Sequence, residues 1–544
     1  MAWRARVLKS VPLIVTSVVL SAGCATGSGD GHLTTAAPKS EADGAATVKT
    51  ATWFEANRHR PGLLRTFVQR MPKGGDLHTH LSGAVYAESY LAWAAASDED
   101  YCVAIQEKSL DLKKCNSVRD ACPSGRCGAD GSLVPIASVL NDPHLYNRLI
   151  DLMSTRNVAF AGQSGHDQFF AAFSQFGPVS KLRLDDMVAE VSSRAASQHT
   201  YYLELMLTLQ GDKVRALGKG IQSEVDRMDL ASARTRLVER GLLQYVAAGQ
   251  KDLDTLVAEA DRTMRCRERD PHPGCSVTIR YLQQTTRTGS LSEVFAQLAY
   301  AFELAQADPR VVGINLVAPE DDRVALRDYA SQMRMLDYLA SLKPNVNIAL
   351  HAGELTLGMT RPEELRVHIR QAIELGRARR IGHGVSVFYE DDALGLMAEM
   401  RKRDVAVEIC LTSNDVILGV RGEQHPFQAY RAAKVPLTLA SDDEGVSRID
   451  LSHEYLRAAL TYQLGYRDLK TLARNSLHYS FLPGLSLWRR HDPFEAVEAC
   501  AGVPLGSPSP PSTCATFLTS SERAREQWRL EAQFVAFEAL DWKL

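Results

Sequence analysis

The sequence predicts a parallel (β/α)8 barrel, an α/β fold, and three observations support this. Short apolar runs recur along the chain, longer segments with a helical pattern separate them, and histidines and acidic residues stand where several runs end. In "LSEVFAQLAYAFELAQ" and "RPEELRVHIRQAIELGRA", apolar residues recur at intervals of three and four, as in amphipathic helices. Alternation of strands and helices favours a parallel sheet with helices outside it.

Eight apolar runs are the candidate strands of this barrel. They span residues 74–81, 201–207, 276–282, 311–317, 345–352, 379–385, 405–411 and 436–443. A doubly wound open sheet is the alternative, but no glycine-rich phosphate-binding turn follows the first run. The interval between the first two runs is too long for an ordinary connection, so we expect a large disulfide-bearing insertion at about residues 95–165. From about residue 485 we expect a proline-rich loop and then a C-terminal helical extension.

Composition sets the broad class of the protein. The 544 residues are 45% apolar and carry a formal net charge of -3. Such a chain can bury a large core, and its charge gives no indication of nucleic-acid binding. We expect one enlarged domain over residues 51–544.

The first 24 residues have the layout of an export signal with a lipobox. Basic residues precede the apolar run "VPLIVTSVVL", which is too short for an ordinary spanning helix, and "SAGC" ends at Cys24. The small residues before Cys24 resemble a bacterial lipobox, whose cysteine is lipidated, and a plain cleaved signal is the alternative. Residues 25–50 are small and polar, as in a flexible tether. We expect an exported lipoprotein at the outer membrane, the cell surface or in the periplasm, in contact with membrane only through its lipid anchor.

The cysteines also indicate an oxidising compartment. Besides Cys24, Cys410 lies in the apolar run "VAVEICLTSN" and is expected to be a buried free thiol. The other eight lie in polar, loop-like surroundings, where disulfides are expected in an exported protein. We expect the pairs Cys266 with Cys275 and Cys500 with Cys514, and two bridges among Cys102, Cys115, Cys122 and Cys127. A zinc knot is the alternative for these last four, although they lack paired CxxC spacing.

Polar side chains gather where four of the predicted strands end. These residues are His78 and His80 in the first, His351 and Glu354 in the fifth, His383 in the sixth, and Asp442 and Asp443 in the eighth. Because the carboxyl ends of barrel strands converge on one face, we expect these side chains to lie together. Three histidines and an aspartate are a sufficient ligand set for Zn²⁺.

A series of motifs carries a resemblance to a known family. In chain order the motifs are "MPKGGDLHTHLSG", "FFAAF", "VVGINLVAPE", "HAGE", "RIGHGV", "CLTSN", "HPF" and "ASDDEG". Over about residues 60–480 they resemble the adenosine deaminase family of metal-dependent amidohydrolases, nearest its secreted, growth-factor-related branch. The resemblance implies one Zn²⁺ per chain, bound by His78, His80, His351 and Asp442.

The resemblance also implies catalytic roles for three residues. His383 and Asp443 orient the water at zinc and take its proton, and Glu354 protonates purine N1, after which hydroxide adds at C6 and ammonia leaves. Zn²⁺ lowers the pKa of a bound water from about 15.7 to about 7. Glu354 needs burial and a raised pKa to carry a proton near pH 7. The structural alternatives are a packed histidine, an acid at a helix N-terminus and a partner of a metal ligand.

The predicted substrate contacts include two departures from the family pattern. Ser82 stands where intracellular members typically have an aspartate that binds ribose, and Ala318 replaces a glycine whose backbone approaches the purine. Glu320 is retained. Phe169 and Phe173, in "HDQFFAAFSQF", form either part of the core or an apolar wall for a flat ligand.

We therefore expect zinc-dependent hydrolytic deamination of adenosine and 2'-deoxyadenosine to inosine and 2'-deoxyinosine, with release of ammonia. The alternatives are the same chemistry on another adenine nucleoside, such as a 5'-modified adenosine or AMP, and a surface lipoprotein that binds nucleosides without chemistry. The expected partner is a small-molecule purine nucleoside rather than nucleic acid, and homodimer formation is left open.

Overall fold

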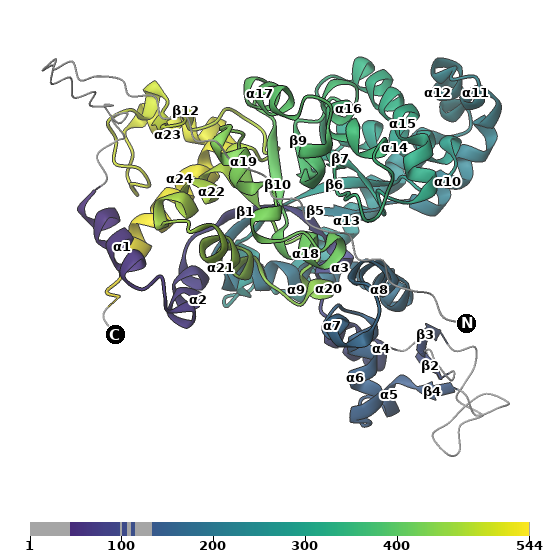
Figure 1. The fold of residues 1–544 in the computed structure, drawn as a ribbon, viewed down its shortest axis with the longest axis horizontal. Coiled ribbons are helices and arrows are strands. Elements are labelled where there is room, and N and C mark those ends of the chain that lie inside the picture. Colours follow the sequence, from purple (N-terminus) through teal and green to yellow (C-terminus); the bar gives the residue numbers. More distant parts are fainter. Residues whose placement is uncertain (1–43, 98–100, 106–109, 115–132, 543–544) are drawn as a thin grey trace, which may run out of the picture. The chain divides into compact units, whose positions relative to one another are not determined.

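Parallel strands in the described part of the chain form one eight-stranded sheet that closes on itself (Figure 1). In sheet order the strands are β1 (Gly74–His80), β5 (Thr200–Leu207), β6 (Thr278–Thr286), β7 (Val311–Val317), β8 (Asn347–Ala352), β9 (Arg380–His383), β10 (Ala406–Ile409) and β11 (Leu437–Leu439). Beyond β11 the chain returns to β1, where the Asp442 amide donates to the His78 carbonyl at 2.9 Å and the His80 amide to the Asp442 carbonyl at 3.0 Å. The predicted (β/α)8 barrel is confirmed, and each predicted run overlaps a barrel strand, although β6 extends four residues beyond its run.

The structure, a computed structural model, describes residues 44–97, 101–105, 110–114 and 133–542. The predicted signal, Cys24 and most of the predicted tether lie outside these residues. Helix α1 (Ala45–Ala56) begins before residue 51, so the tether prediction extended too far toward the domain. In the described ranges, no helix combines the length and the apolar character needed to cross a membrane.

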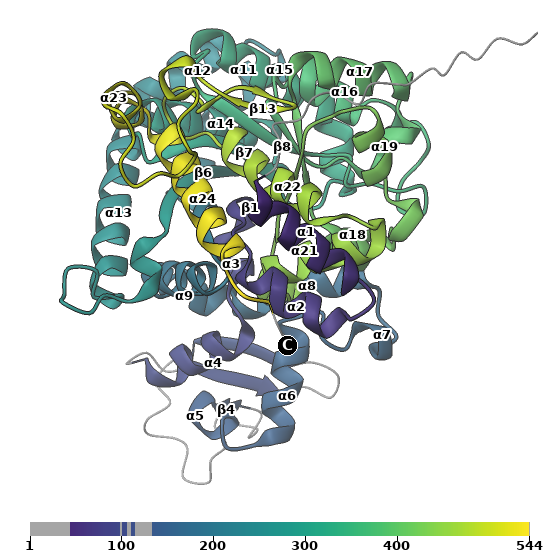
Figure 2. The same ribbon diagram turned by 90° about the vertical axis from the view of Figure 1, so that its left-hand side faces the viewer.

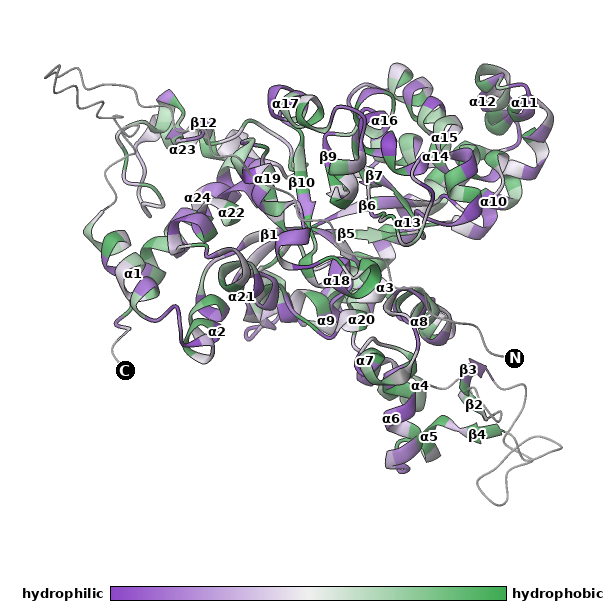
Figure 3. Cartoon of the chain, in the orientation of Figure 1, coloured by the Kyte–Doolittle hydropathy of each residue, from purple (hydrophilic) through white to green (hydrophobic). Residues whose placement is uncertain are grey.

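Helices connect consecutive barrel strands on the outside of the sheet (Figures 1 and 2). They include α10 (Gly211–Gly218), α11 (Gln222–Asp226), α12 (Leu230–Glu239), α13 (Leu242–Thr263), α14 (Leu291–Ala307), α15 (Arg323–Leu342), α16 (His368–Glu374), α17 (Ala393–Arg403), α18 (Leu411–Leu418) and α19 (Phe427–Ala432). After the last strand, β11, come α20 (Glu444–Ser447), α21 (Leu451–Tyr462) and α22 (Tyr466–His478). In α15 the buried residues Ala325, Tyr329, Met333 and Leu336 recur at three and four, while hydrophilic residues fill the outer face (Figure 3).

The connection from β1 to β5 carries the predicted insertion. It contains α3 (Leu81–Ala84), α4 (Ala87–Ala96), α5 (Ile136–Val139), α6 (Pro143–Leu152), α7 (Val158–Ala161), α8 (Gly165–Ser180) and α9 (Leu184–Ser197). It also contains an antiparallel sheet in the order β3 (Leu110–Lys114), β2 (Tyr101–Ile105), β4 (Leu133–Pro135). Helix α8 packs against α18 and α20, which follow β10 and β11, so α8 lies beside the carboxyl end of the barrel.

The C-terminal extension lies at the opposite, amino end of the barrel. Helix α24 (Glu522–Glu538) packs against α22, and its Glu526 accepts a hydrogen bond at 2.9 Å from Thr278, the first residue of β6. The hairpin of β12 (Trp488–His491) and β13 (Phe494–Ala496) and helix α23 (Ser512–Ser520) precede α24. The helix was predicted, whereas the hairpin and α23 fall in the stretch expected to be a loop.

The disulfide predictions are confirmed where the structure describes both cysteines. Cys266 pairs with Cys275, and Cys500 pairs with Cys514. Cys410 is free and buried, as expected. Cys102 on β2 is disulfide-bonded, which does not fit a zinc knot. Cys115, Cys122 and Cys127 lie outside the described residues.

Candidate active site

Four of the predicted residues converge at the carboxyl end of the barrel. Nε2 of His351 lies 3.0 Å from Nε2 of His78 and 3.1 Å from Nε2 of His80. Oδ1 of Asp442 lies 3.4 Å from Nε2 of His78 and 3.3 Å from Nε2 of His80. These residues come from the ends of β1 and β8 and from the segment after β11, and barrel closure brings them together.

An oxygen acceptor holds the other nitrogen of each histidine. Nδ1 of His78 lies 2.7 Å from Glu408 Oε2, Nδ1 of His80 lies 2.6 Å from Gln284 Oε1, and Nδ1 of His351 lies 2.9 Å from Asn315 Oδ1. Because these oxygens only accept hydrogen bonds, each Nδ1 carries the hydrogen and each Nε2 is left with a lone pair.

This donor set fits a bound zinc ion. Three lone pairs and a carboxylate oxygen 3.0–3.4 Å apart repel one another unless a cation lies among them. Burial lowers the pKa of His78, but hydrogen bonds to Asp442 and Glu408 outweigh it and raise the pKa to about 10. Burial and the neighbouring histidines keep the pKa of His351 well below its ordinary value. Protons therefore cannot occupy all three imidazoles, whereas one dication can satisfy all four ligands.

Two residues at this end of the barrel adopt a left-handed backbone conformation. Asp442 has φ 60° and His383 has φ 69°. Such conformations cost a non-glycine residue about 1–3 kcal/mol and persist only where surrounding contacts hold them. At Asp442 the two backbone hydrogen bonds to β1 supply that support. The strain thus coincides with the side-chain cluster.

A chain of hydrogen bonds determines which nitrogen of His383 carries hydrogen. The Phe427 amide donates to Nδ1 of His425 at 3.2 Å, so Nε2 of His425 carries the hydrogen and donates to Oδ1 of Asn414 at 3.1 Å. Nδ2 of Asn414 therefore donates to Nδ1 of His383 at 3.0 Å. The remaining Nε2–H of His383 is buried and has no hydrogen-bond partner within the described residues. Burial lowers the pKa of His383 to about 3, so its ring is a neutral donor.

Two carboxyl groups beside His383 also have unpaired oxygens. Oε1 of Glu354 and Oδ1 of Asp443 are buried and find no hydrogen-bond partner in the described ranges. Oε1 of Glu354 lies 3.6 Å from Nδ1 of His383. Burial, and then the charge of Asp442, raises the pKa of both carboxyl groups well above the ordinary range. Both groups are therefore suited to hold or take a proton near neutral pH.

Comparison with known proteins agrees with this cluster. A family model described as adenosine deaminase matches residues 245–486. Over these residues the chain is similar to the adenosine deaminase family. Among curated members, an adenosine deaminase of Clostridium perfringens is 29% identical over 181 residues, which are 33% of this chain and 51% of the relative. An aminodeoxyfutalosine deaminase of Streptomyces coelicolor is 40% identical over 133 residues, which are 24% of this chain and 32% of that protein. The chain thus spans about half or less of these relatives.

Solved structures of deaminases are similar to this chain at low sequence identity. An N6-methyl-AMP deaminase from Arabidopsis thaliana has a TM-score of 0.48 and 21% identity, with 77% of this chain and 94% of that chain covered. An adenine deaminase from Arthrobacter aurescens has a TM-score of 0.42 and 17% identity, covering 76% of this chain and 94% of that one. The growth-factor-related branch stays a prediction.

The contacts of Glu320 differ from those expected of the substrate-binding residue that the sequence predicted. Oε1 of Glu320 lies 2.6 Å from Nδ1 of His368 and accepts the Gly353 amide at 3.0 Å, while Oε2 accepts the Glu354 amide at 2.8 Å. The residue is 1% exposed. Glu320 therefore holds the backbone of the "HAGE" motif in place, and the geometry corrects its assignment to that of a positioning residue.

The other predicted substrate residues have varied surroundings. Ala318, just after β7, has φ 84°, a conformation that suits the glycine it replaces in the family. Ser82 lies in α3 and is partly exposed. Phe169 is buried in the core, and Phe173 is partly buried with its ring 5.8 Å from that of Phe169. These two rings contribute to core packing, and substrate contact by Ser82, Ala318 and the two phenylalanines stays a prediction.

The partners of the metal-site histidines were missed in the sequence. Glu408, Gln284 and Asn315 lie on β10, β6 and β7, and all three side chains are directed at histidines on other strands. Glu408 and Asn315 are polar residues inside mostly apolar strands, in "VAVEIC" and "VVGINLV", whereas Gln284 lies in "TIRYLQQTT", where polar residues prevail. That position is a usable signal, because a polar residue inside an apolar barrel strand needs a partner.

Proposed function

We propose that this protein catalyses zinc-dependent hydrolytic deamination of adenosine and 2'-deoxyadenosine to inosine and 2'-deoxyinosine, with release of ammonia. One observation carries the proposal. Beside the His/Asp cluster lie three buried atoms without partners in the described chain, namely Glu354 Oε1, His383 Nε2 and Asp443 Oδ1. A protein that only binds nucleosides has no need of this combination of acid, donor and acceptor, so the arrangement favours catalysis over the binding-only alternative.

The metal ligands in this proposal are His78, His80, His351 and Asp442, which together hold one Zn²⁺. Bound zinc supplies Lewis acidity, which lowers the pKa of a water ligand to about 7. Glu408, Gln284 and Asn315 keep the three imidazoles in the orientation and tautomer that a metal needs.

Glu354 acts as the acid toward the purine. Its burial favours the protonated carboxyl group, which can donate a hydrogen bond to purine N1 and make C6 more electrophilic. A cation in the neighbouring cluster acts against this shift, so the pH dependence of turnover measures the balance of the two effects. Glu320 contributes by holding the Glu354 amide.

His383 and Asp443 act on the attacking oxygen. The Nε2–H of His383 is a donor, so it orients that oxygen rather than taking its proton. Asp443 carries the unpaired acceptor Oδ1, which can receive the proton and deliver it toward the leaving amino group. This assigns separate roles to two residues that the sequence treated together.

We further propose that the protein is an exported lipoprotein anchored through Cys24. The order of basic, apolar and small residues before Cys24 supports this, and so do the two disulfides, since such bonds persist in oxidising compartments. Labelling with a lipid precursor, with Cys24→Ser as the comparison, tests the anchor. The proposal fails if both proteins incorporate equal label.

The carboxamide variant Glu354→Gln tests the function. Gln cannot supply the proton, so we expect turnover of adenosine, followed by its absorbance loss, to fall by about 10²–10⁴-fold. Zinc content is expected to be unchanged, because Glu354 is not a ligand. The matched control is Glu390→Gln, which changes another buried glutamate whose pKa burial raises to about 7. Unchanged turnover in Glu354→Gln would sink the assigned role.

A second candidate is the same chemistry on a 5'-modified adenosine, a class favoured by the match to an aminodeoxyfutalosine deaminase. Ser82 stands in place of the usual aspartate, and its uncharged hydroxyl would select less strictly among substrates that differ in the sugar. Turnover of adenosine, 5'-methylthioadenosine and AMP by the zinc-loaded protein separates the substrates. The leading proposal fails if adenosine is inert while another compound is deaminated, and the binding-only alternative replaces it if no purine nucleoside releases ammonia.

A further inference from the structure

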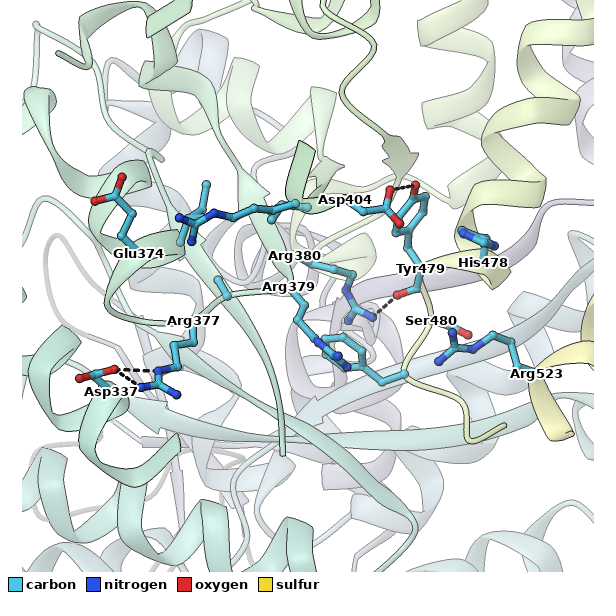
Figure 4. Close-up of a pocket in the computed structure, with 15 residues that line it drawn as sticks. Asp337, Glu374, Arg377, Arg379, Arg380, Asp404, His478, Tyr479, Ser480 and Arg523 are labelled. Atoms are coloured by element: carbon cyan, nitrogen blue, oxygen red, sulfur yellow. Dashed lines mark hydrogen bonds and ion pairs between the residues drawn. The ribbon is translucent and has the colours of Figure 1, made fainter. Parts of the chain in front are cut away.

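A pocket of about 630 Å³ lies at the amino end of the barrel, the end opposite the His/Asp cluster (Figure 4). Its walls are the segments that enter β9 and β10, the residues that follow α22, and the first turn of α24. The pocket is large enough for a small organic molecule and opens to solvent. The proposed deamination makes no use of it.

Basic side chains dominate the pocket, and most of them have acidic partners. Arg377 pairs with Asp337 at 2.6 Å, and Arg403 pairs with Glu399 at 2.6 Å. Arg380 forms buried ion pairs with Glu204 and Glu408, each at 2.5 Å. The charges of these three guanidinium groups are thus balanced within the protein.

Two further arginines in the pocket lack such a balance. Arg379 donates to the side-chain oxygen of Asn347 at 2.6 Å, and Arg523 donates from Nε and Nη2 to the Leu482 carbonyl at 3.1 and 2.8 Å. Both partners are neutral, and neither arginine forms an ion pair with any described carboxylate. In Figure 4 the two side chains enter the pocket from different walls, Arg379 from before β9 and Arg523 from α24.

Without a bound anion, the unbalanced positive charge in this pocket raises the free energy of the folded protein. Arg523 is partly buried, and burial lowers its pKa; the charge of Glu204 acts against this shift, while the charges of Arg379 and Arg380 add to it. Like charges at a partly buried site repel each other, and a bound anion removes that repulsion. Guanidinium groups also match the geometry of phosphate oxygens through paired hydrogen bonds.

We propose that this pocket is a binding site for a phosphate group, either free or part of a small phosphorylated molecule, held between Arg379 and Arg523. The pocket volume exceeds that needed for the oxyanion alone, which leaves room for an attached organic group. The proposed site lies in the same chain as the proposed catalytic centre, and Arg379 and Arg523, which would hold the phosphate, are not among the residues of that centre.

Calorimetry on the full chain loaded with metal tests the proposal. The probes are inorganic phosphate and glycerol 3-phosphate at low ionic strength, with sodium chloride at matched ionic strength as the reference. Arg379→Gln and Arg523→Gln are each expected to weaken binding by about tenfold or more, as follows from losing one charge-assisted hydrogen bond. The matched control is Arg403→Gln, which removes the same charge from the pocket wall but leaves both unbalanced arginines in place.

Each possible outcome either supports or overturns the proposed phosphate site. Phosphate binding by the wild type and by Arg403→Gln, weakened in Arg379→Gln, supports the site, and a higher affinity for glycerol 3-phosphate identifies phosphorylated molecules as the source. Binding no stronger than that of chloride, or equal binding by wild type and Arg379→Gln, overturns it, the latter because phosphate then binds elsewhere. Arg379 is exposed, so its substitution keeps the test valid if Arg523→Gln fails to fold.

Discussion

A Cβ atom on Gly83 would lie 1.5 Å from Oδ1 of Asp443, so the absence of a side chain at residue 83 makes room for this carboxyl group. Gly83→Ala forces Asp443 to move. A displacement of about 1 Å in a catalytic group can cost about 100-fold in rate, and we expect a fall of at least that size. Zinc content, measured by elemental analysis, is expected to stay the same.

The matched control for Gly83→Ala is Gly177→Ala on α8, where an added Cβ meets nothing within 4 Å. Full activity is expected there, because alanine also favours helix. An active Gly83→Ala enzyme would show that Asp443 has no catalytic role.

Ala318 offers a test of backbone strain just after β7. Its φ of 84° is costly for alanine and free for glycine, although glycine loses more entropy on folding. We expect Ala318→Gly to stabilise the protein by about 1 kcal/mol in chemical denaturation. Ala433→Gly, at an ordinary φ of -75°, is expected to destabilise it by about 0.5–1 kcal/mol. Equal effects of the two substitutions would contradict the strain.

The ion pair between His166 and Asp321 predicts a pH dependence of stability. Their Nε2 and Oδ1 atoms lie 3.1 Å apart and link α8 to the loop after β7. The hydrogen bond to Asp321 raises the pKa of His166 from 6.5 to about 9. Because the folded pKa is the higher one, the stabilisation is complete below about pH 6.5 and is lost as the pH rises through 9.

Asp321→Asn is therefore expected to destabilise the protein by about 0.5–1 kcal/mol near pH 6 and by little near pH 10, since the pair is partly exposed. Urea denaturation at both pH values measures the difference. Asp337→Asn is the control, because its partner Arg377 is an arginine, a residue type that stays charged at both pH values. A loss of the same size at pH 6 and pH 10 for Asp321→Asn would refute the assignment.

The chain from His425 through Asn414 to His383 predicts that Asn414 sets the tautomer of His383. In Asn414→Asp a carboxylate faces Nδ1, so the hydrogen moves there and Nε2 loses its donor role. We expect turnover to fall by about 100-fold or more, with zinc content unchanged, as for the loss of one positioned donor. The pH–rate profile should shift as well, which a purely structural defect would not cause. A normal rate and profile would contradict the relay.

Much of the fold could be predicted because strand-forming runs and helical periodicity are local properties. The eight barrel strands and the Cys266–Cys275 and Cys500–Cys514 bridges are of this kind. The hairpin of β12 and β13 was missed because its stability comes from a small core shared with α23 and α24 rather than from a strong pattern of its own.

The same distinction applies to the site residues, because some are visible in local sequence patterns and others depend on tertiary contacts. Histidines and acidic residues at strand ends are visible in the sequence because barrel geometry brings strand ends together. The role of Glu320 could not be read there, because it depends on contacts with His368 and with the amides of Gly353 and Glu354. The partnership of His78 with Glu408 joins residues 330 positions apart, which no local pattern records.

The side chain of Arg380 connects the two ends of the barrel. Its guanidinium lines the amino-end pocket and donates to Glu408, whose other oxygen holds Nδ1 of His78. The orientation of His78 at one end and part of the charge balance of Arg380 at the other thus depend on the same buried carboxylate. A substitution of Arg380 at the amino end of the barrel is therefore expected to change the affinity of the His/Asp cluster for metal at the carboxyl end.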